Sequence, residues 1–183
     1  MSIHVASRRR TAAALSAAYP GARIIDVTSN GPRPWIRMSP FYPHGDIPVP
    51  LSGGAVSQSV EGIWQALKVF DDSDVDLRKL NIVTMAGLKR TVGKHGPVLG
   101  HRAGLHGEHL LPYEQARRAV FLPAYRWVLE NKVADLVAEL RAADGDTVLL
   151  DYTTNGDVTD TSSALSHAAL IRLYVENRWP VEH

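Results

Sequence analysis

Four side chains that can do chemistry fall on one face of a predicted helix in the first half of the chain. They occupy positions i, i+3, i+4 and i+7 of one helical stripe: Glu61, Trp64, Gln65 and Lys68. A carboxylate in the first turn of a helix is favoured in its ionised form, because it faces the positive end of the helix dipole. Such a group can stabilise positive charge on a reacting carbon. The alternative is that Glu61 and Lys68 are solvated and that Trp64 is an ordinary core residue.

Cleavage of a sugar-to-base bond is a reaction that suits this stripe. Its transition state carries positive charge at the anomeric carbon, so one carboxylate stabilises that charge and a second group handles water or the leaving base. Glu61 is the candidate for the first catalytic role, and Asp157 or Asp160 for the second, on a loop that contains glycine. Asp151, at the end of a predicted strand, is the next choice. The alternative for these aspartates is turn formation and helix capping.

Basic residues gather between Gly87 and Arg118, against only Glu108 and Glu114. They are Lys89, Arg90, Lys94, Arg102, Arg117 and Arg118. A local basic patch suits the phosphate groups of a nucleotide or of a nucleic acid. We expect Lys68, or Lys89 with Arg90, to hold a phosphate, and Trp64 to stack on a base or sugar. The alternative is a solvated surface that only keeps the protein in solution.

Four histidines lie in the same basic stretch, at His95, His101, His106 and His109. The pair His106-x-x-His109 has a spacing that a transition metal can use. The segment is rich in glycine and proline and lacks the helical H-E-x-x-H pattern. We therefore expect four solvent-exposed loop histidines and no bound metal, with a histidine-ligated metal enzyme as the alternative.

Length and composition indicate an ordinary globular protein. The chain has 183 residues, 45% hydrophobic and 21% charged, with a net charge of +1 and no cysteine. Disulfides and thiolate catalysis are thereby excluded. No apolar run approaches the ~18 residues that a membrane span needs, so we expect a soluble, cytoplasmic protein. The chain has no G-x-S-x-G elbow, phosphate-binding loop of the G-x-x-x-x-G-K type or G-x-G-x-x-G fingerprint.

The residue pattern predicts one α+β domain over residues 1–183, mostly helical and with a few short strands. A helical extension should cover residues 1–20, with its helix at 7–18. Later helices are expected from a cap at Ser57 or Ser59 to Phe70, at 76–80 and 82–91, from Pro112 to Arg141, and from a cap at Thr161 or Ser162 to Asn177. Pro123 should kink or split the long helix. Extended segments are expected at 23–28, 35–38, 47–50 and 147–152.

The order of these segments resembles the NADAR superfamily. That family has a helix of the type S-x-E-x-x-x-Q-x-x-K, which residues 59–68 match with Ser59, Glu61, Gln65 and Lys68. The basic step at 86–94, Arg102, the Asn131-Lys132-Val133 step and the strand that ends at Asp151 are similar to later family elements. The resemblance runs from about Phe41 to Tyr174. The loop at 155–160 lacks the family's tryptophan, which makes this chain a divergent member.

The resemblance implies a NADAR-like core over residues 35–177 and N-glycosidase chemistry without a cofactor. The ligand would be a nucleotide or an ADP-ribose-type molecule, free or attached to DNA or RNA, with no membrane partner. The site implied is Glu61 with Asp157 or Asp160 at the bond. Substrate contacts would come from Trp64, Gln65, Lys68, Lys89, Arg90, Lys94, Arg102 and Asp151. A second possibility is a binding module for nucleotide or nucleic acid without turnover, which would not need an ionised Glu61.

Overall fold

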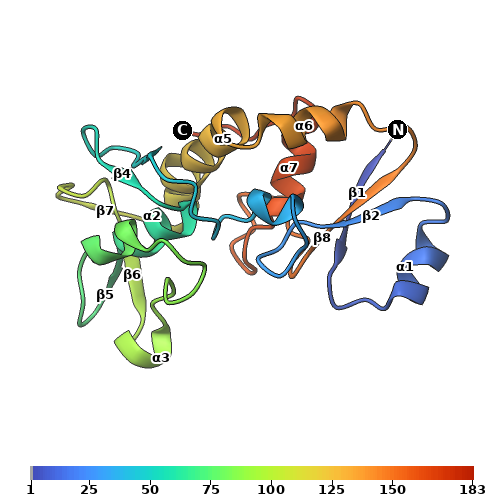
Figure 1. Cartoon of the computed structure of the whole chain (residues 1–183). Helices are drawn as coiled ribbons and strands as arrows, with labels where there is room; N and C mark the ends of the chain where they lie inside the picture. The colour runs from blue at the N-terminus through green and yellow to red at the C-terminus, as the bar shows by residue number, and fades with distance from the viewer. Residues whose placement is uncertain (1) are drawn as a thin grey trace. The chain divides into compact units, whose positions relative to one another are not determined.

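The computed structural model describes residues 2–183 and divides the chain into two compact units (Figure 1). The first unit runs to Ser39 and resumes at Val133–Pro180, and the second comprises Pro40–Lys132 with Val181–His183. The predicted mixture of helices and strands is confirmed. Helix makes up 35% of the chain, a smaller share than the expected mostly helical domain. Between residues 2 and 183, no helix has both the length and the apolar character needed to cross a membrane.

The first unit is built on a three-stranded parallel sheet in the order β1-β8-β2 (Figure 1). Its elements are β1 Ile3–Ser7, α1 Ala12–Ala18, β2 Arg23–Asp26, the 3-10 helix η1 Trp35–Met38, α6 Ala134–Arg141, β8 Thr147–Asp151 and α7 His167–Val175. All five residues of the central strand β8 are buried. Val148 and Leu150 pack with Leu15 of α1 on one face of the sheet. Helix α7 lies against β1 and β8. Because β8 is covered on both faces, its sequence is an almost continuous run of apolar residues.

The second unit contains two small antiparallel sheets and the helices that surround them (Figure 1). Strand β3 Ile47–Pro48 pairs with β4 Val56–Ser57, and the other sheet has the order β5 Lys68–Phe70, β6 Val98–Arg102, β7 Leu110–Leu111. The helices are α2 Val60–Leu67, the 3-10 helix η2 Leu77–Asn81, α3 Val92–His95, α4 Tyr113–Ala116, the π-helical turn η3 Arg117–Phe121 and α5 Leu122–Asn131.

Helix α2 is the centre of the second unit, and all eight of its residues are buried. Ser59 caps it, because the Ser59 hydroxyl accepts a hydrogen bond from the Gly62 amide at 3.0 Å. Gly62 lets η2 approach closely, since a Cβ at this position would lie 2.7 Å from the Lys79 carbonyl oxygen. Helix α2 also packs against η3 and against α5, the helix that contains Pro123.

Several predicted boundaries are confirmed and others are wrong. Strands β2 and β8 and the helical region that opens after Pro112 begin where the sequence places them. Helix α2 begins after the Ser59 cap as predicted but ends at Leu67 and not at Phe70, because residues 68–70 form β5. The N-terminal segment is not helical throughout, because residues 3–7 form β1. Residues 35–38 form a 3-10 helix instead of an extended segment. No helix forms at 82–91, and the last helix is capped by Ser166, not by Thr161 or Ser162.

Candidate functional site

Glu61 is held inside the second unit by the first turn of α2. Its side chain is only 8% exposed, and its backbone amide donates to the Pro40 carbonyl at 2.9 Å. Burial raises the pKa of the Glu61 carboxyl, while the Gln65 hydrogen bond and the positive charges of Lys68 and Lys89 act in the opposite direction. The alternative of a solvated Glu61 is therefore wrong.

Gln65 fixes the orientation of the Glu61 carboxylate. The Gln65 Oε1 accepts the Arg90 backbone amide at 2.8 Å, so its NH₂ group must point the other way. That NH₂ group donates to Glu61 Oε1 at 2.8 Å. Within residues 2–183 this is the single hydrogen bond of the Glu61 side chain. One carboxylate oxygen is thus held by a fixed donor, and the other has no hydrogen-bond partner among the described residues.

Lys68 lies at the junction of α2 and β5 and supplies positive charge that acts on the Glu61 carboxyl. Its ammonium makes no hydrogen bond or ion pair with any described residue, and its aromatic neighbour is the Phe70 ring at 6.0 Å. Burial lowers the pKa of Lys68, and the Glu61 carboxylate raises it. Lys89, which is exposed, lies 5.6 Å from the Phe41 ring centre. Glu61 and Gln65 therefore meet on α2, with the charge of Lys68 acting on the carboxyl, but Lys68 itself lies on β5 and not on the predicted helical stripe.

A pocket of about 370 Å³ opens beside this stripe within the second unit. Its walls are Trp64, Lys68, Val98, Leu99, Gly100, His101 and Tyr113. The Trp64 ring lies 3.8 Å from the His101 ring and 5.8 Å from the Tyr113 ring, measured between centroids. The pocket thus brings Trp64 and Lys68 together with residues 98–101. Glu61 is one helical turn from Trp64 and is not itself part of the pocket wall.

His101 corrects the expectation of four exposed loop histidines. It lies on β6, is 1% exposed and packs against Trp64. His106 and His109 are exposed, and His95 lies 3.4 Å from Asp72. In the part of the chain that the structure describes, no three metal-ligating side chains form a cluster. The sequence signal that was missed is the short strand Val98–Arg102, whose alternation places His101 inward.

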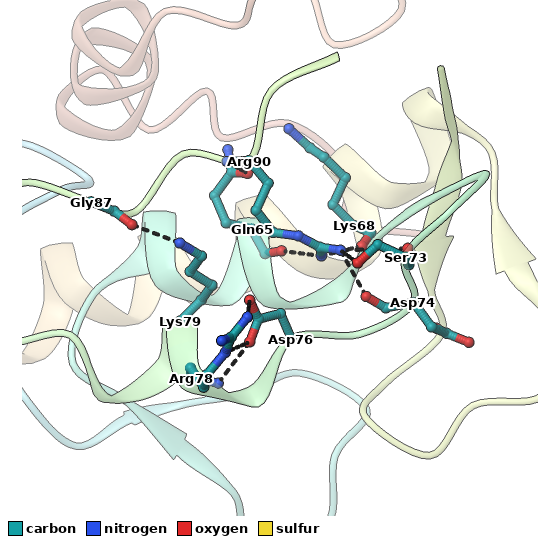
Figure 2. A network of polar contacts seen from close by, with 9 residues as sticks. All are labelled: Gln65, Lys68, Ser73, Asp74, Asp76, Arg78, Lys79, Gly87 and Arg90. Atoms are coloured by element: carbon teal, nitrogen blue, oxygen red, sulfur yellow. Dashed lines mark hydrogen bonds and ion pairs between the residues drawn. The ribbon is translucent and has the colours of Figure 1, made fainter. Parts of the chain in front are cut away.

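The sequence suggests that Arg90 binds a phosphate, but in the structure its guanidinium binds other groups of the protein. Its guanidinium is directed at the end of α2 and the turn after β5 (Figure 2). One terminal nitrogen, Nη1, donates to the carbonyls of Gln65 and Lys68 at 3.0 and 2.6 Å. The other, Nη2, donates to the Ser73 hydroxyl at 2.7 Å and the Asp74 carbonyl at 2.8 Å. Both terminal nitrogens therefore tie backbone segments together.

The remaining basic candidates of this unit are nearer the surface. Arg102 forms a two-pronged ion pair with Asp74, at 3.0 and 2.7 Å, and this guanidinium lowers the pKa of the Asp74 carboxyl. Lys94 is exposed on the short helix α3. Lys68 and Lys89 thus remain the cations closest to the candidate carboxylate.

Asp151 belongs to the first unit, where it forms a buried ion pair with His167. Its Oδ2 lies 2.9 Å from His167 Nδ1 and accepts the Ser166 hydroxyl at 2.8 Å. The other nitrogen of His167 lies 2.9 Å from the Val27 carbonyl, so both ring nitrogens face acceptors, an arrangement that favours the imidazolium form. Although burial opposes both charges, the partner charge and the hydrogen bonds lower the pKa of Asp151 and raise that of His167. Asp151 joins β8 to α7 and Val27.

Asp157 and Asp160 also belong to the first unit, in the loop before α7. Asp157 Oδ1 accepts the amide and hydroxyl of Thr159 at 2.9 and 2.8 Å. Asp160 Oδ1 accepts the amide and hydroxyl of Ser162 at 3.0 and 2.5 Å. These are the contacts expected if the two aspartates serve in turn formation, the alternative to a catalytic role. That either aspartate acts with Glu61 stays a prediction.

Comparison with known proteins gives one family match. A family model described as "Family of unknown function (DUF6939)" matches residues 7–171. No curated protein matches the chain. The match spans both units and includes helix α2 and strand β6.

Proposed function

The chain belongs to the family of unknown function DUF6939, and we propose that it is an N-glycosidase-like hydrolase whose site lies on helix α2 of the second unit. The substrate proposed is a nucleotide or an ADP-ribose-type molecule, free or attached to nucleic acid. The observation that carries the proposal is Glu61: a buried carboxylate with one oxygen fixed by Gln65, beside unpaired positive charge and an aromatic pocket. The likeness of residues 59–68 to the NADAR helix adds support.

The reaction proposed is the attack of water on the anomeric carbon. The carbon–nitrogen bond breaks, its electron pair goes to the base, and the proton lost by water ends on the released base. Positive charge builds on the sugar ring as the bond lengthens, and the Glu61 carboxylate stabilises that charge. Gln65 holds the carboxylate in place before the reaction, so no reorientation is needed at the transition state.

The pocket supports a ligand that combines a flat ring with an anion. Trp64 and Tyr113 offer aromatic surface, Val98 and Leu99 add apolar surface, and Lys68 offers an unpaired ammonium. This combination suits a nucleotide base with its phosphate. Lys68 and Lys89 replace Arg90 as the phosphate contacts in this proposal, because Arg90 uses both terminal nitrogens within the protein.

A second candidate function is binding of the same ligands without turnover. The observation that favours it is the pocket wall, which includes Trp64 and Lys68 but not Glu61. In that case the Glu61–Gln65 pair would only shape the helix beneath the pocket.

The test is product analysis by mass spectrometry after incubation with nucleotides, ADP-ribose and ADP-ribosylated DNA or RNA. Glu61→Gln preserves the acceptor for Gln65 and removes the negative charge. The release of base or ADP-ribose should fall by about 10² or more, the cost of losing one preorganised catalytic group. Glu108→Gln, at an exposed site in the same unit, should leave the rate unchanged. Equal rates in wild type and Glu61→Gln would refute the role of Glu61, and binding without any turnover would favour the second candidate.

A further inference from the structure

His101 carries two buried nitrogen atoms that have no hydrogen-bond partner in the described part of the chain. It is the central residue of a cross-strand row, opposite Lys68 on β5 and Leu111 on β7. Only 1% of its surface is exposed, and within residues 2–183 neither Nδ1 nor Nε2 has a hydrogen-bond partner. Buried polar atoms in proteins are almost always paired, so this side chain calls for an explanation.

Packing alone does not explain the imidazole. The His101 ring lies against Trp64 at 3.8 Å with a tilt of 35°. A phenylalanine could make the same aromatic contact and would bury no unpaired nitrogen. The two nitrogens therefore cost stability that the ring contact does not require. A ligand in the adjoining pocket, of which His101 forms part of the wall, can supply the missing partner.

The surroundings of His101 favour its neutral form. Residues directly opposite in an antiparallel pair place their side chains close together on the same face, so Lys68 lies beside the imidazole. Burial, with a smaller effect from the Lys68 charge, lowers the pKa of His101 to about 3. A neutral imidazole offers one donor and one acceptor. It therefore suits an uncharged polar edge, whereas the ammonium of Lys68 suits an anion.

We propose that this pocket binds an uncharged nitrogen heterocycle that carries an anionic group, with His101 hydrogen-bonded to the edge of the ring and Lys68 paired with the anion. The ring lies against Tyr113 and Leu99, which are the more exposed walls. This inference rests on the proposed function, because the heterocycle is the base that hydrolysis would release. Both nitrogens of His101 are covered, so contact with the ring needs a small rotation of the imidazole or of Tyr113.

Calorimetric titration of the full chain at pH 7 with AMP, adenosine and ribose 5-phosphate tests the assignment. AMP should bind more tightly than adenosine, which lacks the anion, and more tightly than ribose 5-phosphate, which lacks the ring. Lys68→Met should remove the preference for AMP over adenosine. His101→Phe should weaken AMP binding about tenfold or more, which corresponds to the loss of one hydrogen bond. The exposed control His106→Phe should leave AMP affinity unchanged.

Thermal unfolding of the same variants separates recognition from a purely structural role. His101→Phe should raise Tm by about 2–4 °C, because it removes unpaired buried nitrogens while it keeps the ring contact. A structural histidine would instead lower Tm and leave the affinity of the folded fraction unchanged, which would overturn the proposal. If His101→Phe does not fold, nitrogen-15 spectra of wild-type histidine decide. AMP should shift the His101 ring signals, and no shift at saturation would overturn the proposal.

These outcomes are distinct from those that test hydrolysis. AMP binding that depends on His101 without any turnover would sink the proposed reaction and leave this inference standing. Turnover that depends on Glu61, with AMP affinity equal in wild type and His101→Phe, would do the reverse. Absence of binding by all three probes to the wild-type protein would overturn the inference directly.

Discussion

Replacement of Arg90 by lysine should destabilise the second unit by about 3 kcal/mol. Arg90 is 5% exposed and makes four hydrogen bonds of 3.0 Å or less to three carbonyls and a hydroxyl, with its guanidinium 4.9 Å from the Phe70 ring centre. Lysine keeps the charge but presents its donors from a single nitrogen, so it cannot span Lys68, Ser73 and Asp74 at once. Loss of two hydrogen bonds from a charged donor, at ~1.5–3 kcal/mol each and less than additive, gives the figure of about 3 kcal/mol.

The assay is urea unfolding together with hydrogen exchange of the peptide that covers the end of α2. The unfolding midpoint should fall, and exchange should rise at the amides nearest the Gln65 and Lys68 carbonyls. Arg78→Lys is the matched control, since Arg78 lies in the same unit and its exposed side chain pairs with Asp76 at the surface (Figure 2). That variant should unfold like wild type. If Arg90→Lys is as stable as Arg78→Lys and instead loses AMP affinity, the structural assignment is refuted and Arg90 is a phosphate ligand.

Two further predictions concern titration. Asp151→Asn should cost about 3 kcal/mol in free energy of unfolding, because it leaves the buried His167 charge unpaired. The wild-type ion pair stops stabilising the fold when pH falls below the ordinary pKa of an aspartate, because Asp151 is then protonated. It also stops doing so when pH rises through the raised pKa of His167, because the imidazole then loses its charge. Urea midpoints measured from pH 3 to 9 should therefore show a maximum that the variant lacks. The rate of hydrolysis should rise with pH as Glu61 ionises, and the rise should lie above pH 4.5 because burial raises the pKa of Glu61 above that ordinary value. Lys68→Met should move this rise to higher pH, since the Lys68 charge lowers the pKa of Glu61, and an unmoved profile would show that the two charges do not interact.

Helix α2 could be predicted because its signals are local. Ser59 supplies a cap within three residues of the amide that it accepts, and the proline-rich stretch before it cannot continue a helix. The same holds for β8, whose apolar run is bounded by turn residues. Where the determining contacts lie within one or two turns of chain, the residue pattern is sufficient.

The segment from 82 to 102 could not be predicted because distant contacts determine it. The expected helix at 82–91 is replaced by an irregular segment that the Arg90 side chain binds to residues 65–74. Strand β6 exists through its pairing with β5, which lies more than 25 residues earlier. The prediction of the residue that caps α7 was wrong for a different reason. Ser162 is engaged by Asp160 in a turn, and Ser166 takes the cap position four residues later.

The sequence could not show what the polar residues at 61, 65 and 68 meet. An amphipathic pattern assigns Glu61, Gln65 and Lys68 to a solvated or half-open surface, yet α2 is buried on all sides. Inside a protein each polar group needs a hydrogen-bond partner, and here some polar side chains have one within the described chain and others do not. Glu61 and Gln65 have hydrogen bonds within the protein and lie outside the pocket wall. The side chains of Lys68 and His101 make none with residues 2–183, and both residues lie in that wall. The Lys68 ammonium and the His101 imidazole both border the pocket, which is why ligand chemistry should be sought there.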